Sequence, residues 1–208
     1  MSVMDSTTPA PNHHEPVPVN RFALFSETLL AGVLVLVLSL PLVTIPAAYA
    51  AGITHLERHL SGRDDSVRGL WNIFRTALRG SWKIGITTAA AVVVIVLNLM
   101  LAWVGQLPGR EVVLPATVIL AAAAAILLLR TAAAWSDFTG SAADGRETWR
   151  SALAAGQALS VKDWTGSLLL ASALFAAVVF VWMLVALFVV VPGTLILAAA
   201  AVKLRSSR

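Results

Sequence analysis

The sequence predicts an all-α fold, that of a polytopic helical membrane protein, from three observations. Of its 208 residues, 58 % are hydrophobic and only 12 % are charged, whereas soluble domains carry about 25 % charged residues. Four apolar runs are each long enough to cross a ~30 Å hydrocarbon core, which needs about 20 residues: Phe22–Ile53, Gly85–Val104, Val112–Ala134 and Gly166–Val202. The basic residues gather between these runs and form no dense patch, which fits the positive-inside rule and argues against nucleic acid as a partner.

The two ends of the chain differ in composition from this membrane domain. Residues 1–20 are rich in proline, serine and threonine and show no apolar periodicity, which predicts a disordered tail. The helical membrane domain is expected over residues 21–204, followed by a basic C-terminal tail at residues 205–208. The chain has no cysteine, which excludes disulfides, thiolate metal sites and cysteine nucleophiles.

Two prolines interrupt the first apolar run, in the segment SLPLVTIPAAY. Because proline removes a backbone donor and clashes with the preceding turn, Pro41 is expected to end one helix. Pro46 is expected in the first turn of the next helix, with the Thr44 hydroxyl bonding the backbone groups that the prolines leave unpaired. We predict a structural hinge here and a second one at Pro192 and Gly193 in the last run. Each of these two runs is too long for one crossing and too short for two. The number of crossings or re-entrant segments therefore stays open between four and six.

The middle of the chain gives the orientation in the membrane. Trp82 and Trp103 bracket the second run and lie about 31 Å apart along a helix, the separation of two interfacial aromatic belts. The segments from about residue 52 to 83 and from about 130 to 163 carry most of the basic residues. Both are therefore predicted to be cytoplasmic, with the QLPGRE turn outside. A cytoplasmic C-terminus requires a hairpin or re-entrant pair in the last run, and the side of the N-terminus stays open.

An amphipathic helix is predicted over residues 67–83, before the second run. At 100° per residue the larger apolar side chains fall on one face of the helix, and basic side chains line one flank of that face. This pattern is typical of a helix lying at the membrane interface beside anionic headgroups. Another membrane protein could dock on the same surface. A similar order of interfacial segment and span recurs at Glu147–Trp164 and suggests an internal repeat. The predicted contact surface for lipid or protein comprises Arg68, Trp71, Arg75, Arg79, Trp82 and Lys83.

The segment LSLPLVTIPAAYAAGITHLERHLSG, followed by LWNIFRTALRGSWKIGI, resembles the YesL-like family of bacterial integral membrane proteins, a family of unknown function. The resemblance covers residues 22–95 and continues beyond them by hydropathy only. It implies a small multi-pass protein of the bacterial plasma membrane, often linked with carbohydrate uptake systems. It implies no catalytic residues.

Few side chains suggest chemistry. His55 and His59 have the i, i+4 spacing of zinc ligands on a helix face, but Glu57 lies on another face and no third ligand is near, so solvated histidines at a helix end are expected. Arg130 is expected to reach the interface from the third run, and Asp137 to lie just past that run. No pattern of a nucleophile and base or of a phosphate-binding loop is present, so no catalytic, cofactor or metal site is predicted.

The predicted function is that of a non-enzymatic accessory or regulatory component of the membrane. The alternative is a small transporter or channel that uses the helix breaks at Pro41 and Pro46 and at Pro192 and Gly193, because unwound backbone at membrane depth offers free polar groups. The expected lack of buried charges that could couple ions weighs against this alternative.

Overall fold

The computed structural model describes residues 21–61, 66–105, 109–139, 145–183 and 191–206. Within these ranges the chain forms α-helices and one short 3-10 helix and no strand, so the predicted all-α class is confirmed. The predicted N-terminal tail, residues 1–20, lies outside the described residues. The elements in chain order are α1 Arg21–Leu38, η1 Leu42–Thr44, α2 Ile45–Leu60, α3 Val67–Gly80, α4 Trp82–Trp103, α5 Arg110–Phe138, α6 Gly145–Lys162, α7 Trp164–Met183 and α8 Val191–Ser206.

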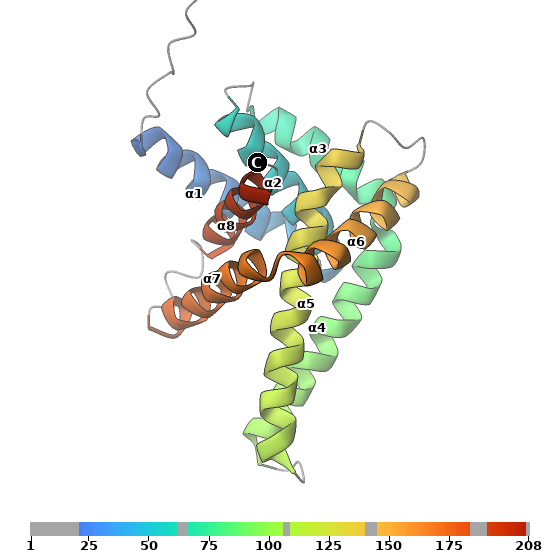
Figure 1. Cartoon of the computed structure of the whole chain (residues 1–208), viewed down its shortest axis with the longest axis vertical. Helices are drawn as coiled ribbons and strands as arrows, with labels where there is room; N and C mark the ends of the chain where they lie inside the picture. The colour runs from blue at the N-terminus through green and yellow to red at the C-terminus, as the bar shows by residue number, and fades with distance from the viewer. Residues whose placement is uncertain (1–20, 62–65, 106–108, 140–144, 184–190, 207–208) are drawn as a thin grey trace, which may run out of the picture.

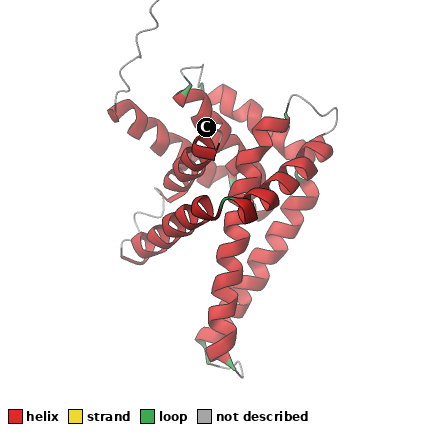
Figure 2. Ribbon diagram, viewed as in Figure 1, coloured by secondary structure: helices red, strands yellow, loops and turns green. Residues whose placement is uncertain are grey.

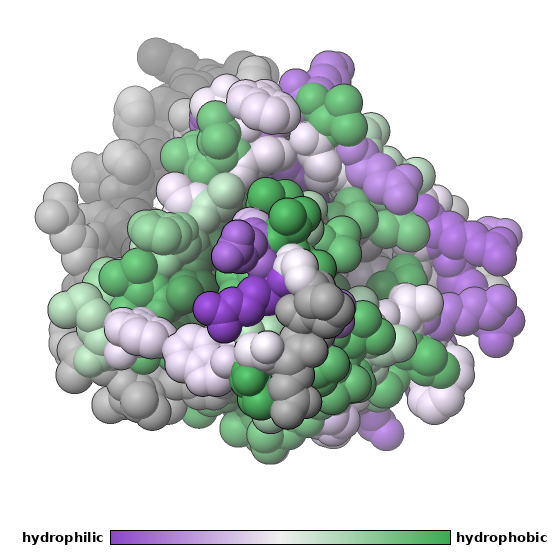
Figure 3. Space-filling view, turned by 90° about the horizontal axis from the view of Figure 1, so that it is seen from below, coloured by the Kyte–Doolittle hydropathy of each residue, from purple (hydrophilic) through white to green (hydrophobic). Residues whose placement is uncertain are grey.

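The helices form a body from which one long hairpin projects. Helices α4 and α5 run antiparallel away from the body, and α7 leaves it at an angle to them (Figure 1). These three helices are long and apolar enough to cross a membrane, and most of their apolar side chains are exposed. Apart from short turns, the described residues are helical throughout (Figure 2). Seen along the hairpin from below, the surface is mostly hydrophobic, with hydrophilic side chains in its centre and along one edge (Figure 3).

The first apolar run folds into two helices joined at the predicted corner. Helix α1 ends at Leu38, and Pro41 stands in extended backbone before η1. Pro46 occupies the first turn of α2, where its missing N–H costs nothing. The Thr44 hydroxyl lies within hydrogen-bond distance of the carbonyls of Leu38 and Pro41, as expected from the sequence.

The last apolar run also folds into two helices, α7 and α8, and the end of α8 returns to the start of α7, where Arg205 pairs with Asp163. Pro192 and Gly193 do not form a break inside a helix but open the first turn of α8. The connection before them, residues 184–190, lies outside the described residues. Helix α8 continues to Ser206, so the predicted tail at residues 205–208 begins inside a helix.

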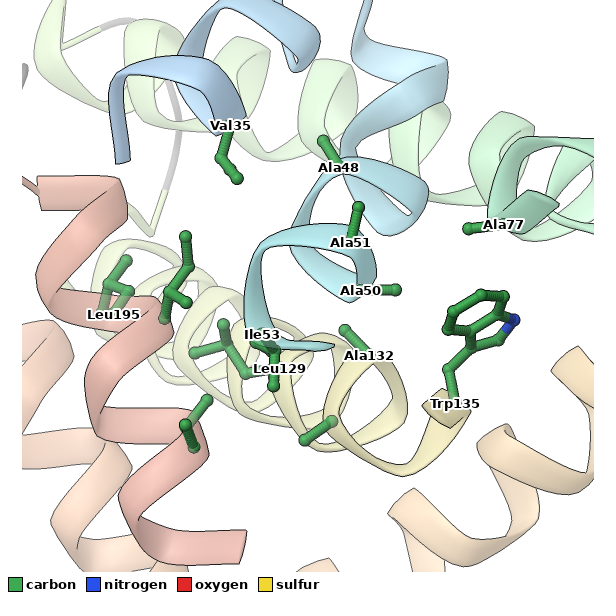
Figure 4. Packing of buried hydrophobic residues seen from close by; sticks show 14 of the residues in the cluster. Val35, Ala48, Ala50, Ala51, Ile53, Ala77, Leu129, Ala132, Trp135 and Leu195 are labelled. Atoms are coloured by element: carbon green, nitrogen blue, oxygen red, sulfur yellow. The ribbon is translucent and has the colours of Figure 1, made fainter. Parts of the chain in front are cut away.

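Helix α2 is the centre of the hydrophobic core. Its run of alanines lets neighbouring helices approach closely, and side chains from α1, α3, α5 and α8 surround it (Figure 4). Helices α1 and α8 cross at two glycines: a Cβ added to Gly32 would lie 2.6 Å from the Gly193 nitrogen. The core residues labelled in Figure 4 are Val35, Ala48, Ala50, Ala51, Ile53, Ala77, Leu129, Ala132, Trp135 and Leu195.

The predicted amphipathic helix at residues 67–83 is shorter than expected. Helix α3 ends at Gly80, whose bare Cα packs on the backbone of Gly145, and Ser81 separates it from α4. Trp82 and Lys83 therefore belong to the following helix. The apolar face of α3 packs on α2 and α6, so the expectation that this face rests on the bilayer is wrong for Leu70 and Phe74, which are buried.

The structure supports the predicted internal repeat. Six residues separate α2 from α3 and also α5 from α6, and a single residue separates α3 from α4 and also α6 from α7. The sequence SGRDDSVRGLW at residues 61–71 corresponds to TGSAADGRETW at 139–149, with glycine, arginine and tryptophan at matching positions. In each half an exposed tryptophan, Trp82 or Trp164, opens the following apolar helix.

Candidate functional site

Two clusters of charged side chains lie where α2, α5 and α8 meet the junction of α6 and α7. The first, called here the Lys203 cluster, comprises Glu57, Ser136, Asp137 and Lys203. The second, called the Arg130 cluster, comprises Arg130, Asp163, Ser167 and Arg205. Together they join four helices, α2, α5, α7 and α8, and Asp163 at the junction of α6 and α7.

The Lys203 cluster ties the last turn of α8 to α2 and α5. Lys203 Nζ lies 3.1 Å from Glu57 Oε1 and 3.0 Å from Asp137 Oδ1. It also donates a 2.6 Å hydrogen bond to Ser136 Oγ, and the Ser136 hydroxyl lies 3.2 Å from Glu57 Oε2. Lys203 and Glu57 are mostly buried, so this pair is less screened by solvent than a surface ion pair.

A polar cavity of about 450 Å³ opens beside this cluster. Two acidic and two basic side chains line it, together with hydroxyl groups from α2 and α5. A smaller cavity of about 200 Å³ shares Asp137 and Lys203 with it and reaches Arg130. Such a lining can hydrogen-bond a small polar or zwitterionic solute. The polar residues lining the larger cavity are Thr54, Glu57, Arg58, Ser61, Ser136, Asp137, Thr139 and Lys203.

The Arg130 cluster fixes the junction of α6 and α7 on α5. Arg130, whose side chain is 4 % exposed, forms an ion pair of 3.3 Å with the Asp163 carboxylate. It also donates hydrogen bonds of 2.9 Å to the Asp163 carbonyl and 3.1 Å to Ser167 Oγ. Arg205 of α8 lies 3.0 Å from the other carboxylate oxygen of Asp163. A guanidinium with several acceptors is well suited to such a buried position.

Asp163 also caps α7. Its carboxylate accepts a 3.0 Å hydrogen bond from the Gly166 N–H, the geometry of a helix N-cap. This hydrogen bond, followed by the neighbouring Arg130 and Arg205, holds the pKa of Asp163 below its ordinary value, although partial burial opposes the shift. The carboxylate is therefore ionised at neutral pH and serves two arginines and one helix terminus at once.

The sequence does not predict these clusters. Solvated histidines are expected from the pattern, but His55 is buried in α2. A lack of buried charges is also expected, whereas Arg130 is buried and Glu57 and Lys203 are mostly buried. The available signal was Arg130 itself, an arginine inside an apolar run, which is a functional hypothesis by default. Among the described residues no three histidine or acidic side chains converge as metal ligands.

The predicted contact surface is divided between two helices. Its α3 part, called here the α3 surface, comprises Arg68, Trp71, Arg75 and Arg79, all exposed on α3. Trp82 and Lys83 are exposed at the start of α4. The Trp71 ring contacts the ring of Phe74, with ring centroids 5.6 Å apart. Because Phe74 is buried, this contact holds the indole ring in place.

The two corresponding tryptophans of the internal repeat have opposite environments. Trp149 of α6 is 1 % exposed, and its indole N–H donates a 2.9 Å hydrogen bond to the Ala77 carbonyl of α3. Trp71 of α3 holds the same place in the repeat and is 48 % exposed. The second half of the chain thus docks its tryptophan on a helix, and the first half leaves its tryptophan at the surface.

The two predicted hinges have different surroundings. Pro46 lines an apolar groove between α4 and α5. Pro192 and Gly193 are buried in the first turn of α8, and Gly193 packs on the backbone of Thr28 and Gly32 in α1. Such close backbone packing is typical of a fixed crossing between two helices.

Comparison of the chain with protein-family models, with curated proteins and with solved structures gave no match.

Proposed function

We propose that this chain is a non-enzymatic accessory or regulatory protein of the bacterial plasma membrane, which docks on another membrane protein through the α3 surface. The observation that carries the proposal is the exposure of Trp71, whose counterpart Trp149 is buried against a helix. A large aromatic side chain supported by the core and left at the surface is a typical anchor of a protein interface.

The charge of the α3 surface indicates the chemistry of the partner. Three arginines lie along one flank of the tryptophan, and no acidic residue lies between residues 66 and 80. The surface therefore fits an acidic patch on a partner, because opposite charges steer association and fix its register. The buried opposite face of α3 holds the surface in place, so little ordering is needed on binding.

The position of the ion pairs supports a cytoplasmic place for this surface. The end of α8 pairs with residues of the two basic segments, through Glu57 and Asp137 on one side and Asp163 on the other. The C-terminus and these segments thus share one side of the membrane, the cytoplasmic side by the positive-inside rule. A role beside a carbohydrate uptake system rests on the resemblance to the YesL-like family.

Reversing the three charges of the α3 surface tests the proposal. In the variant Arg68→Glu, Arg75→Glu, Arg79→Glu, recovery of the membrane partner after crosslinking in native membranes should fall about tenfold or more, because three favourable charge contacts become repulsive. A photo-crosslinker placed at position 71 should capture the same partner. Quantitative mass spectrometry of the crosslinked material measures both effects.

The matched control is Arg110→Glu, a charge reversal at the start of α5, far from α3. Its partner recovery should equal that of the native chain, and a crosslinker at the exposed Val112 should capture no such partner. Equal recovery in the triple variant and the control would refute docking through α3.

A second candidate function, a small transporter or channel, is favoured by the polar cavity beside the Lys203 cluster. Purified protein in liposomes should then move a polar solute faster than empty vesicles do, and Arg58→Met, which changes only an exposed wall of the cavity, should slow this flux. Flux equal to that of empty vesicles over a broad panel of solutes, with correct insertion verified, argues against transport.

A further inference from the structure

An apolar groove of about 450 Å³ separates α4 from α5. It exists because alanines line both helices where larger side chains would otherwise meet, at Ala91 of α4 and at Ala121, Ala124 and Ala125 of α5. Both helices are candidate membrane spans, so a groove between them opens into the hydrocarbon layer. Water has no polar partners along most of its length.

The length and position of the groove match one leaflet of a bilayer. Along α5 its lining extends from Ala121 to Thr131, which is about 15 Å at 1.5 Å per residue and half of a ~30 Å hydrocarbon core. On α4 the lining begins at Ile84, two residues after the exposed Trp82. The groove therefore starts at the level of an aromatic belt and ends near the middle of the membrane.

A positive charge lies beside the end of the groove that is nearest to Trp82. The exposed Lys83, next to Ile84 at the mouth, places a positive charge at headgroup level, where it attracts a phosphate.

We propose that the groove between α4 and α5 is a lipid site that holds one acyl chain of a phospholipid from the leaflet at the Trp82 end of α4. The acyl chain lies against the alanines, and Lys83 faces the phosphate of the same phospholipid. The site is separate from the α3 surface, and docking of a protein there is not required for it.

Two neighbouring alanines of α5 provide the test. Ala124 lines the groove, and Ala123, the residue before it, is exposed outside it. Native mass spectrometry of the detergent-purified protein should find one bound phospholipid in the native chain and in Ala123→Phe. In Ala124→Phe the bound fraction should fall about tenfold or more, because the new ring occupies the space of the acyl chain.

A second readout uses Trp149, which also lines the groove and is shielded from water. The fluorescence of Trp149 is obtained as the difference between each chain and the same chain with Trp149→Phe. In vesicles with brominated acyl chains, this Trp149 fluorescence should be quenched in Ala123→Phe and should not be quenched in Ala124→Phe. A comparison of lipid retention from anionic and from zwitterionic vesicles measures the contribution of Lys83.

Equal lipid retention and equal quenching in the two phenylalanine variants would overturn the proposal. A dimer that Ala124→Phe dissociates, with no lipid bound to the native chain, would also overturn it and assign the groove to a second copy.

Discussion

Replacing Arg130 by methionine should lower the midpoint of thermal unfolding by roughly 5–10 °C. The substitution keeps most of the side-chain volume but removes the hydrogen bonds to Asp163 and Ser167, and it leaves the Asp163 carboxylate without its most buried partner. Loss of one partner from a buried charged cluster costs about 2–3 kcal/mol, and 1 kcal/mol corresponds to about 2–4 °C in a chain of this size. Unfolding in detergent, followed by circular dichroism, measures the shift.

The same substitution at Arg150 is the control. Arg150 is exposed on α6, and surface substitutions change stability by about 0.5 kcal/mol at most, so Arg150→Met should unfold at nearly the native temperature. If the two variants unfold at the same temperature, the Arg130 cluster does not hold the α6–α7 junction.

The acid limb of unfolding gives an independent readout of the Arg130 variant. The pKa of Asp163 lies below its ordinary value of 3.8, so its carboxylate stabilises the native state above about pH 4, and this contribution is lost as the pH falls through the lowered pKa. Without Arg130 the pKa rises toward the ordinary value, although the hydrogen bond from Gly166 remains. As the pH falls below about 4, Arg130→Met should therefore lose less stability than the native chain loses.

The local features of the fold could be predicted from the sequence because they depend on neighbouring residues. The helix bracketed by Trp82 and Trp103 follows from the length of an apolar run between two aromatic residues, and α4 has these bounds. The corner at Pro41, Thr44 and Pro46 follows from the chemistry of proline and threonine, and the hydrogen bonds of Thr44 agree with it. Each of these predictions needs only one stretch of chain.

The ionic clusters could not be predicted in this way because their members are far apart in sequence. Lys203 meets Glu57 across 146 residues and Arg130 meets Asp163 across 33. Whether a basic residue at a helix end is solvated or paired depends on which helices lie beside it. Without the helix order in space, Arg130 had the same pattern as an arginine that reaches the headgroups.

The boundary between α3 and α4 was missed for a related reason. Amphipathic periodicity continues through residue 82, so the pattern predicts one helix over residues 67–83. The break at Ser81 arises where Gly80 meets Gly145 of the other half of the repeat. A contact between two glycine backbones leaves no hydrophobic signal in either segment, since neither residue has a side chain.

Replacing Gly85 by alanine should destabilise the protein by about 2 kcal/mol, although alanine is the better helix former. A Cβ at this position would fall inside the contact distance of the Val43 carbonyl oxygen and 2.9 Å from Val43 Cγ1. Backbone atoms cannot rotate away as a side chain can, so η1 and the start of α4 must separate, and such overpacking costs about 1–3 kcal/mol. Thermal unfolding in detergent measures the loss, and hydrogen exchange at residues 42–45 should become faster.

Gly69→Ala is the matched control, because it is the same substitution in a helix with room for the methyl group. The nearest atom to an added Cβ at Gly69 is Ser66 Oγ at 3.5 Å, an ordinary contact distance. There alanine should stabilise the protein by about 0.5–1 kcal/mol through its lower backbone entropy in the unfolded chain. The two variants must therefore move in opposite directions. If both stabilise the protein, the corner of the first apolar run is free to move away from α4, and the close contact between Val43 and Gly85 does not hold it in place.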